Sequence, residues 1–317
     1  MTTYFLRALG KLLGTLLIAS VLIFLILRVM PGDAATVALG INATPDALEA
    51  WREAHGTNSP LIAQYVTWMG GILHLDFGTS FVTGRALTPL ILDRVQVTLI
   101  IVGLGMVLAL LAAIPLGTLA AVKHRSPLGV GIAGASQIGV ALPSFLVGVL
   151  LVGLFAVRLG WLPSGGWMPP AYDFSEFLRR VTLPVLALAT VQTAVMTRYI
   201  RSAVLEVMRE DFLRTARAGG STWNRALVRH GLRNAAVPIV TVVGVQLASM
   251  LIGAVVIERV FVVPGIGSML VDAVGQRDLQ AVQGIVMVLV TIVVVLNIAV
   301  DLLYMVLDPR IRLRESS

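Results

Sequence analysis

The sequence contains no cysteine, and that absence excludes several kinds of chemistry. Without cysteine among its 317 residues, the chain has no disulfide bond, no thiolate nucleophile and no cysteine-ligated metal or cluster. Histidine is scarce as well, with four residues: His55, His74, His124 and His230. They form neither a His-Glu-x-x-His motif nor a pair four residues apart, so the sequence predicts no metal site.

Lysine is almost absent, and this bears on the use of ATP. The only lysines are Lys11 and Lys123, and neither is followed by serine or threonine. A P-loop requires Gly-x-x-x-x-Gly-Lys-Ser/Thr, in which the lysine reaches the phosphates and the hydroxyl holds magnesium. The chain therefore cannot hydrolyse ATP by that route. Any energy for transport must come from a partner or from a gradient.

Charged residues are few and apolar residues are many. Charged side chains make up 13% and hydrophobic ones 57% of the sequence, with a mean hydropathy of +0.90. Soluble domains average about 25% charged and about 45–50% apolar residues. The composition therefore excludes an ordinary water-soluble globular protein and predicts a chain embedded in a lipid bilayer.

Six apolar stretches are long enough to cross that bilayer as helices. A spanning helix needs about 20 mostly apolar residues, and lipid would leave the edges of an open sheet unpaired. The predicted fold class is an all-α polytopic membrane protein with six transmembrane helices. The predicted spans are Leu12–Leu27, Val95–Val122, Leu128–Val157, Val181–Thr197, Ala235–Ile257 and Val282–Val300.

The basic residues predict the orientation of these spans. Six crossings place both termini on one side, and that side carries 15 lysines and arginines against nine on the other. The positive-inside rule then makes both termini cytoplasmic. Because the net charge of +7 follows this topology, it does not indicate nucleic acid as a partner. An uninterrupted apolar run and a turn at Pro31–Gly32 favour an uncleaved first helix over a signal peptide.

Two loops stand out between the predicted spans. The outer loop, residues 31–94, should hold one or two short surface helices between Pro45 and Trp68, followed by Gly70–Gly71 and Gly78 as helix breakers. The inner segment 198–234 should continue the fourth span as a helix, turn at Gly219–Gly220 and begin a second helix. A projecting helix–turn–helix is the shape of a docking element. The alternative is a basic helix on anionic lipid, which would need a bulky apolar face that this turn lacks.

Two polar residues inside the predicted spans, Ser136 and Asp301, each allow a structural and a functional interpretation. Ser136 lies in a stretch resembling a nucleophile elbow but with one residue too many, so we favour helix packing along Gly131, Ala135 and Gly139 over catalysis. Asp301 lies near the inner end of the last span. We favour an ion pair between Asp301 and an arginine such as Arg198 or Arg201 over a proton relay.

The chain also resembles a known family from end to end. Several stretches, taken in their order around the six spans, resemble the B-type permease subunit of dipeptide, oligopeptide and nickel ABC importers. The stretches are Leu27–Asp33, Leu75–Ser80, Pro115–Gly117, Leu142–Phe145, Leu159–Gly166, Arg198–Arg201, Glu210–Gly220, Glu258–Gly267 and Asp301–Arg310.

The signature of that family is an inner loop called the EAA loop, Glu-Ala-Ala-x3-Gly-x9-Ile-x-Leu-Pro. Here the general form is met at Ala216, Gly220 and Leu232, and the remaining positions follow the peptide-permease form, with Gly219 in place of its usual lysine. The resemblance implies that this loop is a coupling helix seated in a separate ATPase subunit. The implied coupling residues are Arg214, Thr215, Ala216, Arg217, Ala218, Gly219, Gly220, Ser221 and His230. Candidates for structural or gating roles are Arg198, Arg201, Pro143, Pro238, Glu258, Pro264, Gly265, Gly267, Asp301 and Asp308.

The resemblance also implies a complete assembly in the cytoplasmic membrane of a prokaryote. Its partners would be a second, C-type permease, two ATP-binding cassette ATPases that hold ATP and Mg²⁺, and an extracytoplasmic solute-binding protein. This chain would bind no cofactor and catalyse no reaction. Short peptides are the implied cargo, with nickel or glutathione as alternatives and an ATP-independent channel or carrier as the rival class. Residues 1–94 would form the first helix and outer loop, 95–307 the type I permease core, and 308–317 a cytoplasmic tail.

Overall fold

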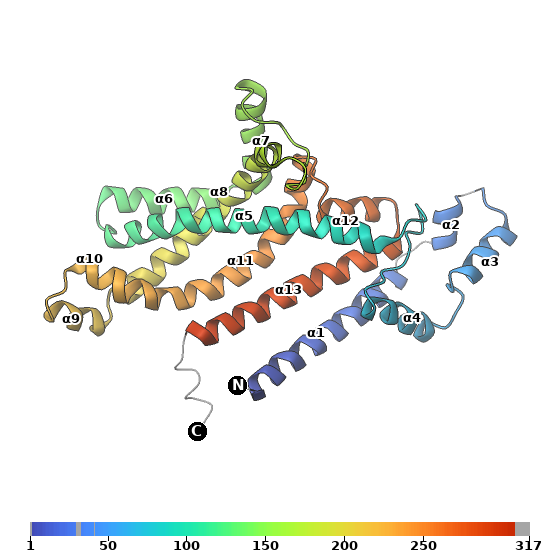
Figure 1. Ribbon diagram of the computed structural model, residues 1–317, viewed down its shortest axis with the longest axis horizontal. Helices are drawn as coiled ribbons and strands as arrows, with labels where there is room; N and C mark the ends of the chain where they lie inside the picture. Colours follow the sequence, from blue (N-terminus) through green and yellow to red (C-terminus); the bar gives the residue numbers. More distant parts are fainter. Residues whose placement is uncertain (1, 30–32, 41, 308–317) are drawn as a thin grey trace. The chain divides into compact units, whose positions relative to one another are not determined.

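The computed structural model describes residues 2–29, 33–40 and 42–307, and this part of the chain is built from helices (Figure 1). The expected all-α fold class is confirmed. The long helices are α1 (Thr2–Val29), α5 (Leu87–Val122), α8 (Phe174–Val207), α11 (Leu232–Val260) and α13 (Leu279–Leu307). The shorter ones are α2 (Ala34–Leu39), α3 (Pro45–Ala54), α4 (Leu61–Leu73), α6 (Pro127–Ala141), α7 (Ser144–Leu151), α9 (Asp211–Ala218), α10 (Trp223–Ala226) and α12 (Ile266–Gly275), with π-helical η1 (Val152–Arg158) and η2 (Leu227–Gly231).

Among the described residues, five helices are long and apolar enough to cross a membrane by themselves, and a bent pair supplies the sixth candidate. The bent pair refines one prediction. The stretch Leu128–Val157 was expected to be one span, with Pro143 as a candidate for a structural or gating role, and in the structure α6 and the α7–η1 helix meet at 97°. Pro143 causes the break because it has no backbone N–H and holds Leu142 in an extended conformation (ψ 126°). The five single spans are Leu9–Arg28, Leu87–Val122, Phe174–Val207, Asn234–Val260 and Leu279–Val300.

The predicted outer loop holds the expected surface helices, α3 and α4, and an additional short helix, α2. The expected break at Gly70–Gly71 was wrong, because α4 continues to Leu73. Gly71 instead permits a close approach: a Cβ atom there would lie 2.8 Å from the carbonyl oxygen of Asp76. The chain therefore turns back over the end of α4 after the helix, rather than breaking inside it.

The chain divides into two compact units, Met1–Val97 with Pro264–Ile298, and Thr98–Val263 with Ala299–Ser317. In the first unit, Leu87 and Ile91 of α5 pack with Ile266 of α12 and Ile285 of α13 in a buried apolar cluster. Buried Asp278 precedes α13 and accepts hydrogen bonds from the Ser80 hydroxyl (2.5 Å) and from two backbone N–H groups. This carboxylate ties the loop before α5 to the start of α13.

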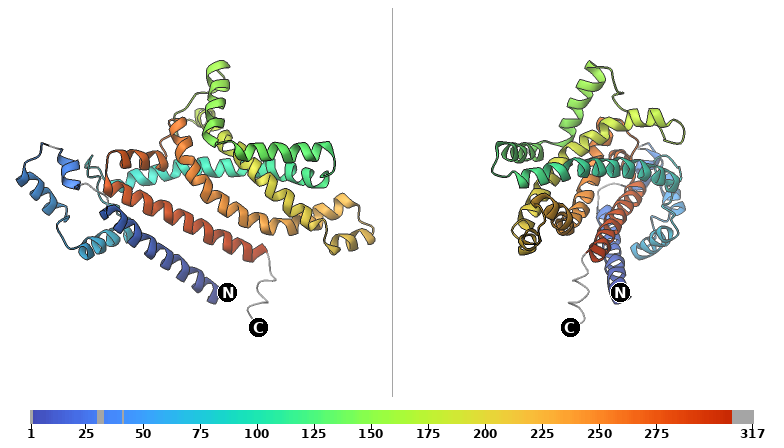
Figure 2. Two further views of the ribbon diagram at one scale, coloured as in Figure 1. Left: turned by 180° about the vertical axis from the view of Figure 1, so that it is seen from behind. Right: turned by 60° about the vertical axis from the view of Figure 1, so that its left-hand side comes forward.

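In the second unit, α8 is the central helix and packs against α6, α7 and α11 (Figure 2). Small residues bring these helices close together. A Cβ atom at Gly117 of α5 would lie 2.8 Å from Ile200 Cβ of α8, and one at Gly139 of α6 would lie 2.6 Å from Ala194 Cβ. Substitution at either glycine would push α8 away from its neighbour.

Candidate functional site

Residues 198–234 form the predicted projecting helix–turn–helix at the end of α8 (Figure 1). The structure corrects one part of the prediction, which continued the fourth span as a single helix up to Gly219–Gly220. Helix α8 ends at Val207, and a short turn separates it from α9, which begins at Asp211. An acidic residue in the first turn suits the positive end of the helix dipole. The element that presents the Gly219–Gly220 turn is therefore a separate short helix, α9, rather than the tip of α8.

Helix α9 is attached to the rest of the chain by one face. Leu213 is 1% exposed and lies in a buried cluster with Ile200, Val204 and Val207 of α8. The same cluster includes residues of α5, α10, η2 and α11. The next residue, Arg214, is exposed and pairs with Asp211 at 3.2 Å. A displacement of α9 would thus act on α8 and α11 through Leu213.

The turn after α9 depends on the backbone of Gly220. Its φ angle is +89°, in the left-handed region that glycine adopts without cost. The N–H of Ser221 donates to the carbonyl oxygen of Ala216 at 3.2 Å. These two features define a Schellman cap, which satisfies a carbonyl at the end of the helix. The double glycine therefore ends α9, as predicted.

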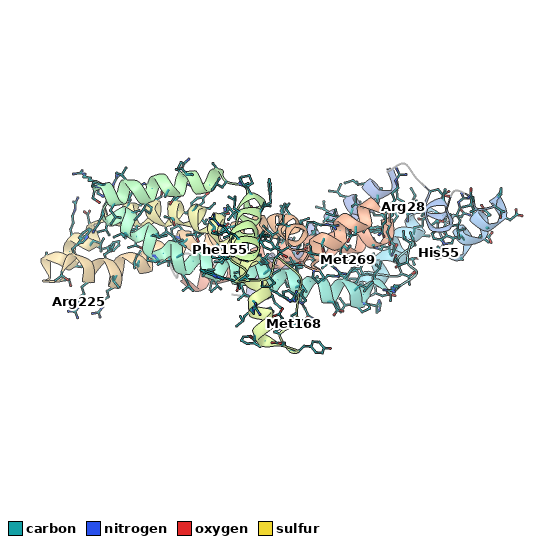
Figure 3. All side chains as sticks on the ribbon, turned by 90° about the horizontal axis from the view of Figure 1, so that it is seen from above. Arg28, His55, Phe155, Met168, Arg225 and Met269 are labelled. Carbon is teal, nitrogen blue, oxygen red and sulfur yellow. The ribbon has the colours of Figure 1, made fainter. Side chains whose placement is uncertain are left out.

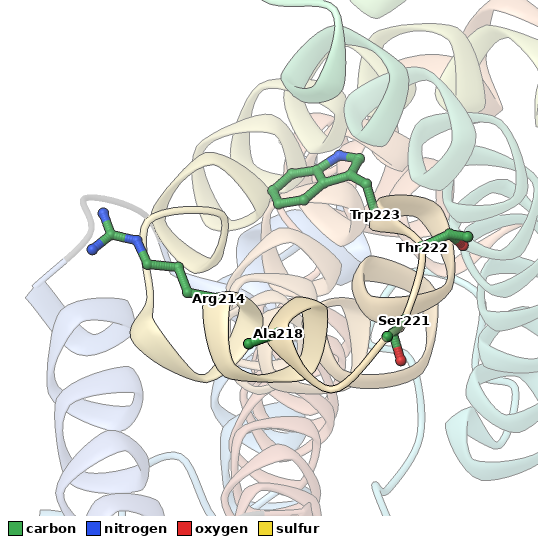
Figure 4. Close-up of a pocket in the computed structure, with 6 residues that line it drawn as sticks. Arg214, Ala218, Ser221, Thr222 and Trp223 are labelled. Carbon is green, nitrogen blue, oxygen red and sulfur yellow. The ribbon is translucent and has the colours of Figure 1, made fainter.

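The surface around this turn is open. Arg214, Ala218, Gly220, Ser221, Thr222 and Trp223 line a shallow pocket of about 510 Å³ (Figure 4). Figure 4 shows the Arg214 side chain extending away from the indole of Trp223. A Cβ atom on Gly220 would meet nothing within 4 Å. The turn thus requires the backbone conformation of Gly220, whereas no described atom of this chain would contact a side chain at that position.

The described cations around the turn are exposed: Arg209, Arg214, Arg225 and Arg229. The predicted coupling residues Arg214 to Ala218 lie in α9, Gly219 to Ser221 in the turn, and His230 in η2. The side chains of Arg217 and His230 are not among those described. The structure therefore brings the predicted residues of α9 and the turn together, and it places His230 in the neighbouring π-helix.

Sequence patterns did not predict the π-helix η2, which directly follows α10. A Cβ atom on Gly231 would lie 2.7 Å from Leu227 Cδ1 and 3.4 Å from Val207 Cγ1. Gly231 thus allows η2 to lie against the end of α8. π-helical turns are frequent at functional sites, but the apolar spacing of a π-helix over five residues resembles that of an α-helix, so no pattern signalled it.

The candidates for structural roles divide between the two units. In the second unit, Glu258 of α11 is 1% exposed and accepts a hydrogen bond from the Thr98 hydroxyl at 2.5 Å. Phe261, fully buried, accepts a hydrogen bond through its carbonyl oxygen from the N–H of Gly166 at 2.7 Å. Sequence reasoning singled out Glu258, but its partner Thr98 lies 160 residues away and carried no signal.

The remaining candidates occupy helix boundaries or helix interiors. Pro143 precedes α7 at the bend, and Pro238 lies inside α11. In the first unit Gly265 precedes α12, Gly267 is buried within α12, and Pro264 comes before both. Pro115 and Pro184, which could act as kinks, also lie inside helices.

The predicted ion pair of Asp301 stays a prediction. Arg198 and Arg201 lie on α8, and the guanidinium carbon of Arg198 is 5.2 Å from the ring centroid of Tyr199. Asp301 lies in α13, but its side chain is not described, and Asp308 lies outside the described residues.

The packing reading of Ser136 is supported, with one correction. Ser136 is buried, and its hydroxyl donates to the carbonyl oxygen of Ile132 in its own helix at 2.9 Å. Gly139 contacts α8, as expected. Gly131 and Ala135, in contrast, are exposed, and a Cβ atom at Gly131 would meet nothing within 4 Å. Within this chain the small residues therefore allow close approach at Gly139 and not along the whole ridge.

Comparison with known proteins identifies the family. Residues 1–102 match the N-terminal model of binding-protein-dependent transport system membrane components, and residues 113–313 match the model of the binding-protein-dependent transport system inner membrane component. The oligopeptide transport system permease protein AppB of Bacillus subtilis (strain 168) is 38% identical over 314 residues, which cover 98% of this chain and 99% of the relative. A "Probable peptide ABC transporter permease protein" of Sinorhizobium fredii (strain NBRC 101917 / NGR234) is 36% identical over 312 residues, covering 98% of this chain and 100% of the relative.

Taken together, the two family models extend over the long apolar helices and the projecting loop, and each of the two relatives does so alone. The resemblance read from the sequence is thereby confirmed. The chain belongs to the family of binding-protein-dependent transport system inner membrane components, the permease subunits of ABC importers.

Proposed function

We propose that this chain carries short peptides across the cytoplasmic membrane of a prokaryote as one half of a two-permease pore. Relatives that align over nearly the whole chain are named oligopeptide or peptide transport permeases. The apolar spans provide a path through the bilayer, and the chain carries no P-loop of its own. The driving force would come from two separate ATPase subunits that bind ATP and Mg²⁺. This chain would then have no catalytic role.

The observation that carries the coupling proposal is the turn at Gly219–Gly220. It combines a fixed backbone conformation, open space above Gly220 and a rim of exposed arginines. A partner with a shallow groove and acidic edges could receive such a turn with close backbone contact. The loop and both termini would then face the cytoplasm, in agreement with the distribution of basic residues.

The buried cluster around Leu213 gives the proposed mechanical route. When the ATPases close on ATP, they would displace α9, and the cluster would pass this displacement to α8 and α11. A pore of this kind must have two conformations of similar free energy, and ATP binding shifts the balance between them. A solute-binding protein, docked on the outer face and its loop 31–94, would release its cargo into the opened pore.

Peptide uptake into proteoliposomes holding the complete transporter tests this function. We expect a labelled tripeptide, presented with the binding protein, to accumulate only when ATP is enclosed with the ATPases, because the chain has no P-loop. Competition with glutathione and with Ni²⁺ would identify an alternative cargo. Uptake of equal rate without ATP would instead identify a channel or gradient-driven carrier and would refute the proposal.

A further inference from the structure

The first unit contains a small polar cavity that the transport mechanism does not use. It has a volume of about 280 Å³ and lies among α1, α4, the loop before α5 and the start of α13. We call it the α1–α4 cavity; its lining includes Arg28, His55, Gln64, Trp68, Gln280 and Gln283. Figure 3 labels two of these lining residues, Arg28 and His55.

Several polar atoms in the lining have no partner within the described structure. The indole Nε1 of Trp68 and the amide Nε2 of Gln283 are buried without a hydrogen bond, and their residues are 8% and 5% exposed. The Oε1 atom of Gln64 is also buried without a hydrogen bond. Its assignment as oxygen is secure, because the Nε2 of Gln64 already donates to the carbonyl oxygens of Thr57 and Ser59. Buried polar groups are normally satisfied, so the cavity calls for a polar occupant.

The charge of the lining indicates the sign of that occupant. Arg28 contributes a guanidinium, which lies 5.1 Å from the ring centroid of Phe24 and forms no ion pair with another described residue. None of the described residues that line the cavity is acidic. Arg28, Trp68 and Gln283 together present one charged and two neutral donors, whereas Gln64 presents one acceptor. Three donors around one space match an anion that has several acceptor oxygens, and a phosphate has more of them than a carboxylate.

The position of the cavity indicates the source of the phosphate. Arg28 is the last residue of the span Leu9–Arg28, so its guanidinium lies where the hydrocarbon meets the headgroups. Apolar side chains on both helices are exposed beside it: Ile26 of α1 is 61% exposed, and Ile62 and Val66 of α4 are 79% and 60% exposed. Acyl chains could cover these residues while the headgroup occupies the cavity. We propose that the α1–α4 cavity binds the phosphate of an anionic phospholipid.

Native mass spectrometry of the complete, delipidated transporter tests this proposal. The probes are dihexanoyl-phosphatidylglycerol and inorganic phosphate. Arg28→Gln removes the charged donor, and Trp68→Phe removes one N–H while keeping an aromatic ring in the apolar cluster with Phe24 and Met287. The matched control is Arg85→Gln, which removes an exposed charge from the loop before α5 at a residue that does not line the cavity.

We expect the wild-type chain to bind the phosphatidylglycerol probe saturably, with about tenfold weaker binding after Arg28→Gln, since a bond to a charged group is lost. Trp68→Phe should weaken binding by a smaller factor, and Arg85→Gln should leave it unchanged. Equal binding by all four proteins, or no saturable binding of either probe, would overturn the proposal. If inorganic phosphate bound as tightly as the lipid probe, the lipid source would be refuted and a site for free phosphate would take its place.

Discussion

Gly220→Trp is expected to abolish ATP-driven uptake and the stimulation of ATPase activity, while the protein still inserts into the membrane. A tryptophan at φ +89° strains the turn that ends α9, at about 1–2 kcal/mol for a residue other than glycine. Its side chain would also fill the open space over the turn, where we place the ATPase. The measurements are peptide uptake and ATPase activity of the complete transporter, with membrane insertion followed by immunoblotting.

Smaller substitutions separate the two causes of this loss. Asparagine tolerates the left-handed conformation, so Gly220→Asn keeps the turn and adds a side chain. We expect it to impair coupling nearly as strongly as tryptophan. Gly219→Ala is the milder comparison within the same turn, because Gly219 lacks a positive φ angle and its added Cβ would meet the nearest atoms at 3.5 and 3.6 Å. Uptake at the wild-type rate in the Gly220→Asn and Gly220→Trp proteins would show that nothing approaches this backbone closely.

Leu213→Ala should uncouple the permease from ATP without touching the exposed surface of α9. Leu213 is 1% exposed and anchors α9 to α8, and truncation of a buried leucine costs about 2–5 kcal/mol. Because α9 has eight residues, that loss would allow it to leave its position on α8. We expect uptake to fall at least tenfold, measured in proteoliposomes.

The neighbouring residue provides the control for this prediction. Phe212→Leu changes a residue that is 37% exposed and leaves the buried anchor intact, so its uptake should stay near that of the wild type. ATPase activity distinguishes loosened coupling from general unfolding: in the Leu213→Ala transporter we expect basal hydrolysis to continue and transport to be lost. Normal uptake in the Leu213→Ala protein would rule out Leu213 as the link between α9 and α8.

The elements that sequence could predict are those with a local cause. Apolar runs marked the membrane helices, because hydrophobic length is set by the thickness of the bilayer. The Gly219–Gly220 turn was predictable because glycine alone takes a positive φ angle freely. The direction of the chain after Leu142 was not predictable from hydropathy, because α6 and α7 are similarly apolar and a 97° bend leaves that pattern unchanged. Pro143 marked the place of the bend but not its angle.

The contacts that complete each unit join residues far apart in sequence. Asp278 and Ser80 are 198 positions apart, and Glu258 and Thr98 are 160 positions apart. Single polar residues in a loop or an apolar run carry no sign of the partner that folding brings to them. The same holds for the α1–α4 cavity, since Arg28, Trp68 and Gln283 come from three separate helices or their ends.

Photocrosslinking from position 222 tests most directly whether the turn after α9 is the contact with the ATPase. Thr222 is exposed and lines the pocket beside Gly220, so a benzophenone amino acid placed there would react with whatever covers the turn. In the complete transporter we predict an adduct between this chain of 33.8 kDa and the ATPase subunit, and no such adduct from the same probe at Arg85. Adducts with lipid and none with the ATPase would contradict the account and would favour a basic helix lying on the membrane surface.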